Sequence, residues 1–375
     1  MNELHIDKTH WKKYRFDEMV QNVSERVEPS QTDLDMYVGL EHIDPDTLHL
    51  SRHGHPSDVE GTKLRFYKGD IIFGRRRAYQ RKTALATTDG ICSAHAIVVR
   101  AKEDVVDPMF LPFLFHSKNF IDMAITISVG GLSPTINWKD IAKQEFLLPP
   151  KAEQKRLAEL LWAADEVVEK EKMEKERMEM YKTSVCNDFF KTIESYKPIK
   201  SFGNVFTGST PSTKILKYWN GEYHFLTPTE INNTLEPQTA SRFVTIEGLK
   251  ASREISSGDV LVTCVGEIGR ITIASKKCCA NQQINVISPN NTIDSKYLFY
   301  SLKQYKNLLL KATTISVVPI LVKSSFENIQ LPDFPINKKG VFVKQMDDIE
   351  QQIEKCSILL EQSQQIKQEL INKLF

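Results

Sequence analysis

Long apolar runs, paired cysteines and catalytic signatures are scarce or missing in this chain. No apolar run approaches the roughly 18 residues that cross a membrane, and the first residues, MNELHIDKTHWKKYRF, lack the apolar core of a signal peptide. The six cysteines are scattered apart from adjacent Cys278 and Cys279, and no CxxC motif occurs. These absences disfavour membrane proteins, disulfide-rich secreted proteins and zinc modules, and they predict a cytoplasmic chain.

Each catalytic signature that we considered fails in at least one essential position. GNVFTGST (203–210) has the glycine spacing of a P-loop, but Ser209 stands where a lysine must pair with phosphates. The histidines of HLSRHGH (49–55) have no cysteine or carboxylate at a firm metal-ligand spacing. Glu153-Gln154-Lys155 fits the Glu-x-Lys of nucleases, but no strand-borne aspartate precedes it. The chain also lacks GxGxxG, GxSxG and the Asn-Pro-Pro-aromatic tetrad of adenine methyltransferases. We therefore expect a binding protein with no catalytic residue, no metal site and no cofactor of its own.

The composition is typical of a globular protein with more than one domain. Hydrophobic residues make up 41% and charged residues 26%, which is too apolar for extensive disorder. At roughly 150 residues per domain, 375 residues predict two or three domains. The net charge of +1 argues against indiscriminate coating of nucleic acid, although it allows local basic patches.

Two stretches without proline or glycine predict long helices. The first begins at Lys151, after Pro149 and Pro150, and runs to about residue 194 with interleaved charges; the second covers 344–375. Each carries a narrow apolar stripe, which is typical of a coiled-coil seam. The stripe of the first stretch comprises Leu157, Leu161, Ala164, Val168, Met173, Met180 and Tyr181. The stripe of the second comprises Ile349, Ile353, Cys356, Leu360, Ser363, Ile366, Leu370 and Leu374.

The two halves of the chain repeat one pattern about 185 residues apart. YKGDIIFG (67–74) corresponds to SSGDVLVT (256–263), and CSAHAIVV (92–99) corresponds to ANQQINVI (280–287). The chain is therefore one unit of globule plus long helix, written twice. We predict an α/β (α+β) fold with a pseudo-twofold internal repeat, in which two antiparallel coiled-coil helices separate two similar globules. The expected segments are globule 1 (1–150), spacer helix 1 (151–196), globule 2 (197–333) and spacer helix 2 (334–375).

This duplicated order of motifs resembles the specificity (S) subunit of type I restriction-modification enzymes. The resemblance rests on the GDII and GDVL strands, the CSAH and ANQQ segments, the LPP…EQ helix start, and GSTPSTKILKYWNGEYHFLTPTEIN (208–232), which is similar to the opening of a target recognition domain. It covers essentially the whole chain. The first half departs from it by lacking the TPS and YWxG opening, and the second helix start, LPDFPINKKGVF, has lost the Glu-Gln.

The resemblance implies a non-catalytic, DNA-binding subunit. Each target recognition domain would read one part of an asymmetric, bipartite double-stranded DNA target, and the paired helices would hold the two domains apart. The helices would also dock two methyltransferase (M) subunits, which carry S-adenosylmethionine. Restriction (R) subunits, which use ATP and Mg, would cut the DNA.

In the first half, a basic stretch carries the candidate DNA contacts. Residues 63–84 hold eight Lys and Arg against one acidic residue, Asp70. Arginine suits phosphates and the guanine edge because its planar fork donates in pairs. The alternative is a solvated basic face. The candidates in this stretch are Arg75, Arg76, Arg77, Arg81 and Lys82.

Further candidates lie at equivalent places of the two halves and near turns. Asn and Gln donate and accept together, which matches the adenine edge. The alternative for these segments is a polar strand start that satisfies loop backbone. The strand-start candidates are Ser93 and His95 in the first half and Asn281, Gln282 and Gln283 in the second. Lys214, Lys217 and Arg270 are candidates near turns, while Tyr218 and Trp219 are expected to pack in the core.

Two other classes of function remain open at this point. One is a nuclease or methyltransferase with unrecognised motifs, which would show metal-dependent cleavage or methyl transfer by the purified chain alone. The other is a coiled-coil scaffold that never touches DNA. The basic stretch at 63–84 weighs against a scaffold, and a salt-titrated DNA-binding measurement would separate it from a DNA reader.

Overall fold

The computed structural model describes residues 6–193, 195–237, 239–314 and 317–375. They fall into two compact units: unit 1 comprises Met1–Glu174 with Cys356–Phe375, and unit 2 comprises Lys175–Lys355. These units cut across the four expected segments, because each long helix contributes one part to each unit. Each unit is described by itself below.

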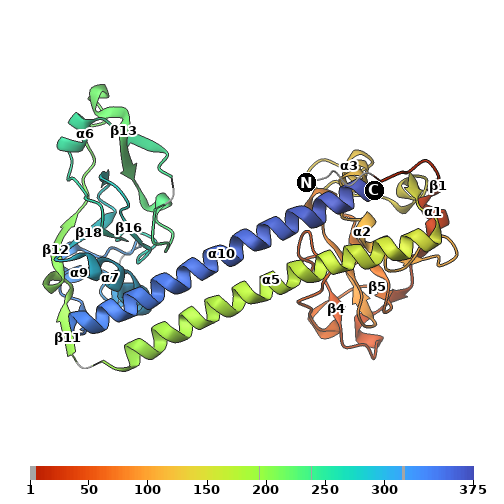
Figure 1. Ribbon diagram of the computed structural model, residues 1–375, viewed down its shortest axis with the longest axis horizontal. Helices are drawn as coiled ribbons and strands as arrows, with labels where there is room; N and C mark the ends of the chain where they lie inside the picture. Colours follow the sequence, from red (N-terminus) through yellow and green to blue (C-terminus); the bar gives the residue numbers. More distant parts are fainter. Residues whose placement is uncertain (1–5, 194, 238, 315–316) are drawn as a thin grey trace. The chain divides into compact units, whose positions relative to one another are not determined.

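The described strands of unit 1 form two four-stranded sheets and a two-stranded ribbon. Strands β1, β4 and β5 are labelled in Figure 1. The first sheet is antiparallel throughout, in the order β2 (Val20–Val23), β9 (Ala96–Ala101), β6 (Ile71–Gly74), β7 (Thr83–Leu85). The second sheet ends in a parallel pair and has the order β3 (Arg26–Val27), β5 (Lys63–Phe66), β8 (Gly90–Cys92), β4 (Tyr37–Val38). The ribbon joins β1 (Lys12–Arg15) to β10 (Glu145–Leu148).

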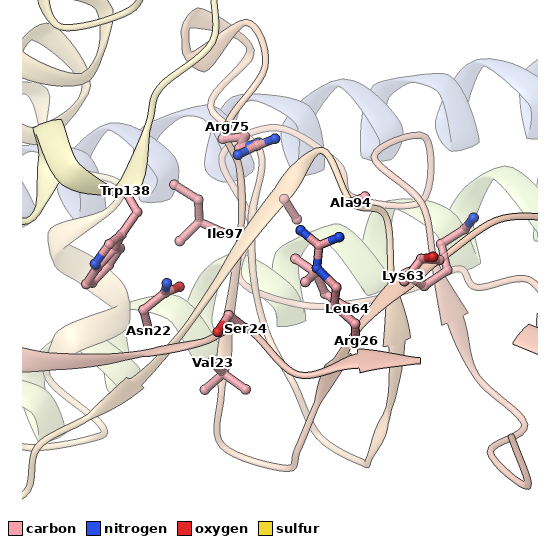
Figure 2. Close-up of a pocket in the computed structure, with 12 residues that line it drawn as sticks. Asn22, Val23, Ser24, Arg26, Lys63, Leu64, Arg75, Ala94, Ile97 and Trp138 are labelled. Atoms are coloured by element: carbon pink, nitrogen blue, oxygen red, sulfur yellow. The ribbon is translucent and has the colours of Figure 1, made fainter. Parts of the chain in front are cut away.

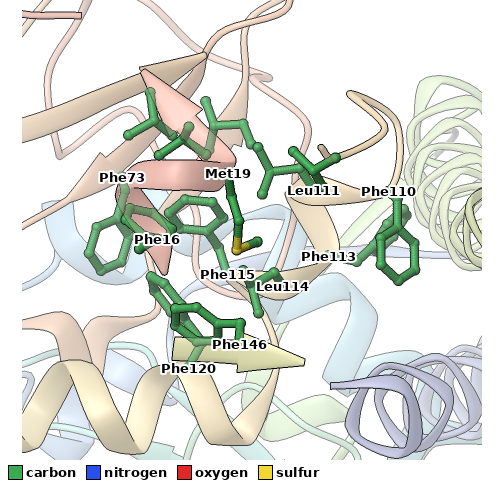
Figure 3. Close-up of a cluster of buried hydrophobic side chains, with 14 of the residues drawn as sticks. Phe16, Met19, Phe73, Phe110, Leu111, Phe113, Leu114, Phe115, Phe120 and Phe146 are labelled. Carbon is green, nitrogen blue, oxygen red and sulfur yellow. The ribbon is translucent and has the colours of Figure 1, made fainter. Parts of the chain in front are cut away.

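The core of unit 1 is aromatic and lies between the first sheet and short helices. The helices are α1 (Phe16–Met19), α2 (Leu111–Leu114), α3 (Lys118–Thr126) and α4 (Trp138–Ile141). Phe16 is fully buried, and its ring centroid lies 5.9 Å from that of Phe115 and 5.8 Å from that of Phe146 (Figure 3). Strand β6 is buried along its whole length, which explains its uninterrupted IIFG sequence.

Unit 2 repeats this plan with a changed second sheet. Its antiparallel sheet has the order β12 (Gly203–Thr207), β18 (Ile284–Pro289), β15 (Val260–Thr263), β16 (Ile271–Ile273). Its other sheet has the order β14 (Arg242–Val244), β13 (Trp219–Leu226), β17 (Cys278–Ala280), and a ribbon joins β11 (Ser195–Pro198) to β19 (Gln330–Asp333). The short helices are α6 (Ile246–Lys250), α7 (Thr292–Gln304), α8 (Lys306–Lys311) and α9 (Lys323–Phe326).

Strand registers confirm the internal repeat predicted from the sequence. In unit 1 Ile72 lies opposite Val98, and in unit 2 Leu261 lies opposite Val286. A parallel pair also recurs, with Val38 opposite Cys92 and Leu226 opposite Ala280. The two halves therefore build one scaffold from different side chains.

The two long helices are present as expected. Helix α5 spans Lys151–Lys191 and α10 spans Ile336–Leu374, so α10 begins eight residues before the proline- and glycine-free stretch. Each follows a proline, Pro150 or Pro335, whose missing N–H is not needed at that position. None of the described helices is long and apolar enough to cross a membrane.

Within each unit, the parts of α5 and α10 that belong to it run antiparallel. In unit 1, Leu157 and Leu374 line one cavity, and further along the helices Lys367 Nζ lies 3.0 Å from Asp165 Oδ1. Residues further along α5 therefore meet residues earlier in α10, as antiparallel helices require. In unit 2, Lys182 Nζ lies 2.7 Å from Glu350 Oε1, and the Phe189 and Phe342 rings stack with centroids 4.1 Å apart.

The predicted seam is wrong at four positions, which were all assigned to the apolar stripes. Met173 is 49% exposed and Met180 is 65% exposed. The other two positions are equivalent in the repeat: Tyr181 is 50% exposed and Ile366 is 56% exposed. The residue that follows each of them, Lys182 or Lys367, turns inward instead. Each lysine meets a carboxylate of the opposite helix within its unit, and this ion pairing outweighs the apolar pattern at both positions.

Candidate nucleic-acid interface

Three loops meet at one edge of unit 1 and bring most of the first-half candidates together. The Arg75 backbone N–H donates to the His95 carbonyl at 3.1 Å, which ties the β6–β7 loop to the β8–β9 loop. Arg77 N–H donates to the Pro134 carbonyl at 2.8 Å, which adds the glycine-containing loop at 128–136. Ser93 lies in the β8–β9 loop, where its hydroxyl accepts from the His95 N–H. The predicted residues 75–77, 93 and 95 therefore share one surface.

This surface is strongly cationic. Burial, followed by the charges of Arg76 and Arg75, lowers the pKa of His95, so its ring is neutral near pH 7. A neutral imidazole donates from one nitrogen and accepts at the other. Within the described residues, neither Arg76 nor Arg77 has a carboxylate partner. Unpaired guanidinium groups beside a neutral donor and acceptor suit phosphates and base edges.

The turn that carries the arginines is strained. Arg77 and Arg81 have φ of 55° and 54° and flank the 3-10 turn Ala78–Gln80. The corresponding loop of unit 2 uses glycines at its positive φ positions, Gly266 (73°) and Gly269 (78°). A non-glycine residue in this region costs about 1–2 kcal/mol, and such strain clusters at functional sites. Unit 1 thus has arginines at the two positive-φ positions of this loop, where unit 2 has glycines.

Arg81 and Lys82 differ from the other candidates because they bond within unit 1. The Arg81 guanidinium pairs with Asp46 and donates to the His116 carbonyl at 2.9 Å and to Gln368 Oε1 at 3.2 Å. Lys82 Nζ donates to the Leu40 carbonyl. These contacts hold the loop in place, so in this structure Arg81 and Lys82 support the loop rather than face outward as free cations.

The second-half candidates at 281–283 occupy the equivalent edge of unit 2. Cys264 N–H donates to the Gln283 carbonyl at 2.8 Å, in the place of the Arg75–His95 bond. Asn281 Nδ2 donates to Gln283 Oε1 at 2.9 Å, and Thr210 Oγ1 donates to Gln282 Oε1 at 2.8 Å. Here the loop edge presents neutral amides and a hydroxyl rather than arginines.

Gly208 holds β12 against this loop. A Cβ at Gly208 would lie 2.3 Å from the Asn281 carbonyl oxygen and 2.5 Å from that of Ala280. We expect G208A to push the 281–283 loop away and to destabilise unit 2 by about 1–3 kcal/mol. Thermal unfolding and hydrogen exchange at residues 280–284 would measure the effect. G131A is the control, because a Cβ there meets nothing within 4 Å, and equal effects of both changes would contradict the close-approach argument.

The structure places the remaining candidates elsewhere in unit 2. The Arg270 side chain is 19% exposed and lies 3.6 Å from Glu267 Oε2, so it is largely used within its turn. Lys214 and Lys217 are exposed around the 3-10 turn Leu216–Tyr218, and among the described residues no contact joins them to the 281–283 loop. Trp219, expected in the core, is half-buried beneath the Arg242 guanidinium, 4.2 Å from its ring centroid.

Sequence reasoning missed a cleft beside the loops of unit 1. Arg26, Asn22 and Trp138 line it together with Lys63 and Arg75 (Figure 2). No sequence signal joins these positions, because they come from separate strands, a loop and a short helix. Within the described part of the chain, no three His, Cys, Asp or Glu side chains gather in an arrangement that would hold a metal ion.

Sequence comparisons match both halves to one family. The model of the type I restriction modification DNA specificity domain matches residues 10–180 and again residues 192–365. The MjaIX specificity subunit of Methanocaldococcus jannaschii is 32% identical over 142 residues, which is 36% of this chain and 33% of that protein. The EcoDI specificity subunit of Escherichia coli is 29% identical over 174 residues, 45% of this chain and 38% of that protein. The match therefore spans roughly a third of the length of these two relatives. The putative MjaX specificity subunit of M. jannaschii is 22% identical over 89% of this chain and 85% of its own length.

Solved structures share the fold along nearly the whole chain. A chain from a study of complex assembly and conformational transition of the type I R-M system aligns with a TM-score of 0.63 at 18% identity, covering 97% of both chains. The type I restriction-modification S subunit from M. genitalium aligns with a TM-score of 0.60 at 14% identity, covering 99% of this chain and 98% of that one.

Proposed function

The chain belongs to the family of type I restriction-modification DNA specificity proteins, and we propose that it selects the DNA target of such a system. Each globule reads one part of an asymmetric, bipartite, double-stranded site. The chain itself catalyses no step.

One observation supports this proposal above the others: the same loop scaffold occurs twice with different side chains. The backbone bond that joins the two loops is conserved between the units, as Arg75 to His95 and as Cys264 to Gln283. Around it, unit 1 presents arginines and a neutral histidine, and unit 2 presents amides. A duplicated scaffold with different loop chemistry suits the reading of two different half-sites.

The side-chain types suggest how each half reads. Arginine pairs with the O6 and N7 edge of guanine or with phosphates, and Asn or Gln pairs with the N6 and N7 edge of adenine. Because the net charge is only +1, affinity rests on local cations and falls as salt rises. Phosphate contacts set register and base contacts set sequence.

We expect the double variant N281A/Q282A to change base preference in one half of the target and to leave the other half unchanged. Loss of a bidentate base contact removes about 1–3 kcal/mol of discrimination. Selection of bound sequences from a randomised DNA library would measure the change, with the full-length chain alone and assembled with methyltransferase subunits.

N204A is the matched control, because Asn204 is exposed on β12 at the end away from the 281–283 loop. A wild-type chain without sequence preference at any salt concentration would overturn the proposal. Metal-dependent cleavage or methyl transfer by the chain alone would favour the catalytic alternative instead.

We further propose that the partners are two methyltransferase subunits, joined in some assemblies by restriction subunits. S-adenosylmethionine would then be carried by the methyltransferases, and ATP and Mg by the restriction subunits. Exposed apolar side chains on α5, including Met173 at 49% and Met180 at 65% exposure, offer contact points for docking.

A further inference from the structure

A polar cleft of about 230 Å³ opens beside the loop surface of unit 1 (Figure 2). Its walls come from the end of β2, the starts of β3, β5 and β9, the β6–β7 and β8–β9 loops, and the first residue of α4. Arg75 and Ala94 belong both to this cleft and to the loops described above. The cleft is therefore continuous with the candidate interface.

Among the residues that the structure describes, three cations and no carboxylate line the cleft. Arg26, Lys63 and Arg75 contribute the positive charge, and Lys63 Nζ is satisfied by backbone carbonyls, one of them Gly61 at 2.8 Å. Within the described chain, the Arg26 and Arg75 guanidinium groups have no hydrogen bond or ion pair. Arg75 Nε is buried without a hydrogen-bond partner, as are Arg65 Nε and Arg270 Nε. Arg75 differs from those two because, within the described residues, it has no carboxylate at ion-pair distance.

Other arginines of unit 1 show what a structural role looks like in this fold. Arg100 Nε lies 2.7 Å from Asp70 Oδ1, and Arg65 NH1 lies 3.5 Å from Glu25 Oε1. Among the described residues, Arg26 on β3 and Arg75 just after β6 have no such carboxylate. Their charge is left available for an anion from outside the chain.

Unit 2 shows that the fold does not require this cationic cleft. The position of Arg75 is taken by Cys264, as the shared backbone bond to the opposite loop demonstrates. Beside it, Arg253 NH1 donates to the Thr207 carbonyl at 2.7 Å, and Thr207 Oγ1 donates to Asn285 Oδ1 at 2.8 Å. At these positions of unit 2, side chains thus form hydrogen bonds within the unit.

We propose that the cleft of unit 1 takes one sugar–phosphate unit of the bound DNA backbone. The phosphate lies between the guanidinium groups of Arg26 and Arg75, and the attached sugar lies toward Trp138 and Asn22. Guanidinium forks match phosphate oxygens in geometry and charge. This inference rests on the proposed function. It assigns to the first globule a phosphate anchor that sets the position of Arg76, Arg77 and His95 over the bases.

The test measures DNA binding by the full-length R26Q and R75Q variants as a function of salt. Loss of one phosphate contact is expected to weaken binding about 5- to 20-fold for target and non-target DNA alike. The slope of log K against log salt should become shallower by about 0.9 for each lost contact. Base preference should stay unchanged, and R75K should keep the wild-type slope.

R156Q is the matched control, because it removes the same charge from an exposed site on α5 that lines a different cavity. Methylphosphonate substitution of single phosphates provides the second readout. One position should weaken the wild-type complex and have no further effect on R75Q, which would place that phosphate in the cleft.

Several outcomes would overturn the assignment. One is that R26Q and R75Q both behave like R156Q. Another is that R75Q alters base preference at an unchanged salt slope. A third is that inorganic phosphate competes better than chloride at equal ionic strength, which would make the cleft a free-anion site. Each of these leaves the proposed function intact if the wild-type chain still prefers its target, so the two failures are distinguishable.

Discussion

Replacing Asp165 with asparagine is expected to lower the free energy of unfolding of unit 1 by about 3–5 kcal/mol. The Asp165 side chain is 2% exposed and the Lys367 side chain is 8% exposed, and the two meet at 3.0 Å. Asp165 Oδ2 also lies 2.6 Å from His49 Nε2. An amide keeps the shape but cannot neutralise the buried ammonium, so the charge of Lys367 is left uncompensated.

The same carboxylate links stability to pH through two groups. The pKa of His49 is raised, chiefly by its hydrogen bond to Asp165. Burial and the charge of Lys367 act in the opposite direction, while the negative charges of Asp165 and Glu169 add to the rise. The stabilisation by protonated His49 is fully present below the ordinary value of about 6.5 and is lost as pH rises through the raised pKa. Burial raises the pKa of Asp165, but His49 and Lys367 outweigh it and the net pKa is lowered. That contribution is present above about pH 3.9 and is lost as pH falls through the lowered value.

Urea unfolding followed by tryptophan fluorescence would measure both effects, because the Trp162 ring lies 6.1 Å from that of His49. E166Q is the control, since Glu166 and Lys170 form an exposed pair on the same helix, and its loss should change stability by no more than about 1 kcal/mol. D165N should also flatten the pH dependence above pH 6.5. If D165N and E166Q proved equally stable, the buried pair would not stabilise unit 1.

The repeat and the helices could be predicted from the sequence because both depend on local patterns. Proline placement and a proline-free charged run were sufficient for α5. The individual residues of the helix–helix seam could not be predicted, because apolar periodicity favoured Tyr181 and Ile366 over the lysines that follow them. Only the three-dimensional pairing reveals that Lys182 and Lys367 each have a carboxylate opposite within their unit.

The candidate interface was predictable in part for a similar reason. The loop residues at 75–77 and 281–283 were found because basic runs and amide runs are local features. The partners that set their roles are distant in sequence, as Asp46 is for Arg81. The cleft that joins Arg26 to Trp138 arises from strand pairing and short helices, and neither residue has a neighbour in sequence that marks it as a ligand.

The start of α10 carries the other large expected effect, and the internal repeat explains it. Gln154 of α5 is buried, donates from Nε2 to the Pro149 carbonyl at 2.9 Å, and accepts from Asp107 N–H at 2.7 Å. The position 185 residues later is Lys339, which is equally buried and lies 3.0 Å from Asp294 Oδ1 and 2.9 Å from Asp333 Oδ1. The Glu-Gln missing from the second helix start is thus replaced by a buried ionic cluster.

K339Q is therefore expected to destabilise unit 2 by about 3–5 kcal/mol, although it restores the residue type of the first helix, because two carboxylates lose their shared cation. Asp333 also pairs with Lys197 at 2.8 Å and is replaced by Leu148 at the equivalent position of unit 1. The double variant D333L/K339Q should consequently be more stable than K339Q alone, while Asp294 Oδ2 still accepts from Asn291 Nδ2 at 2.8 Å at the start of α7.

Urea unfolding of unit 2 and hydrogen exchange in β19 and α7 would measure these changes. K344Q is the matched control, since Lys344 is exposed on the same helix and its loss should leave stability nearly unchanged. A double variant that is no more stable than K339Q would show that Asp333 and Lys339 are not coupled. The coupling energy between Asp333 and Lys339 measures how far the buried lysine of unit 2 depends on the aspartates around it.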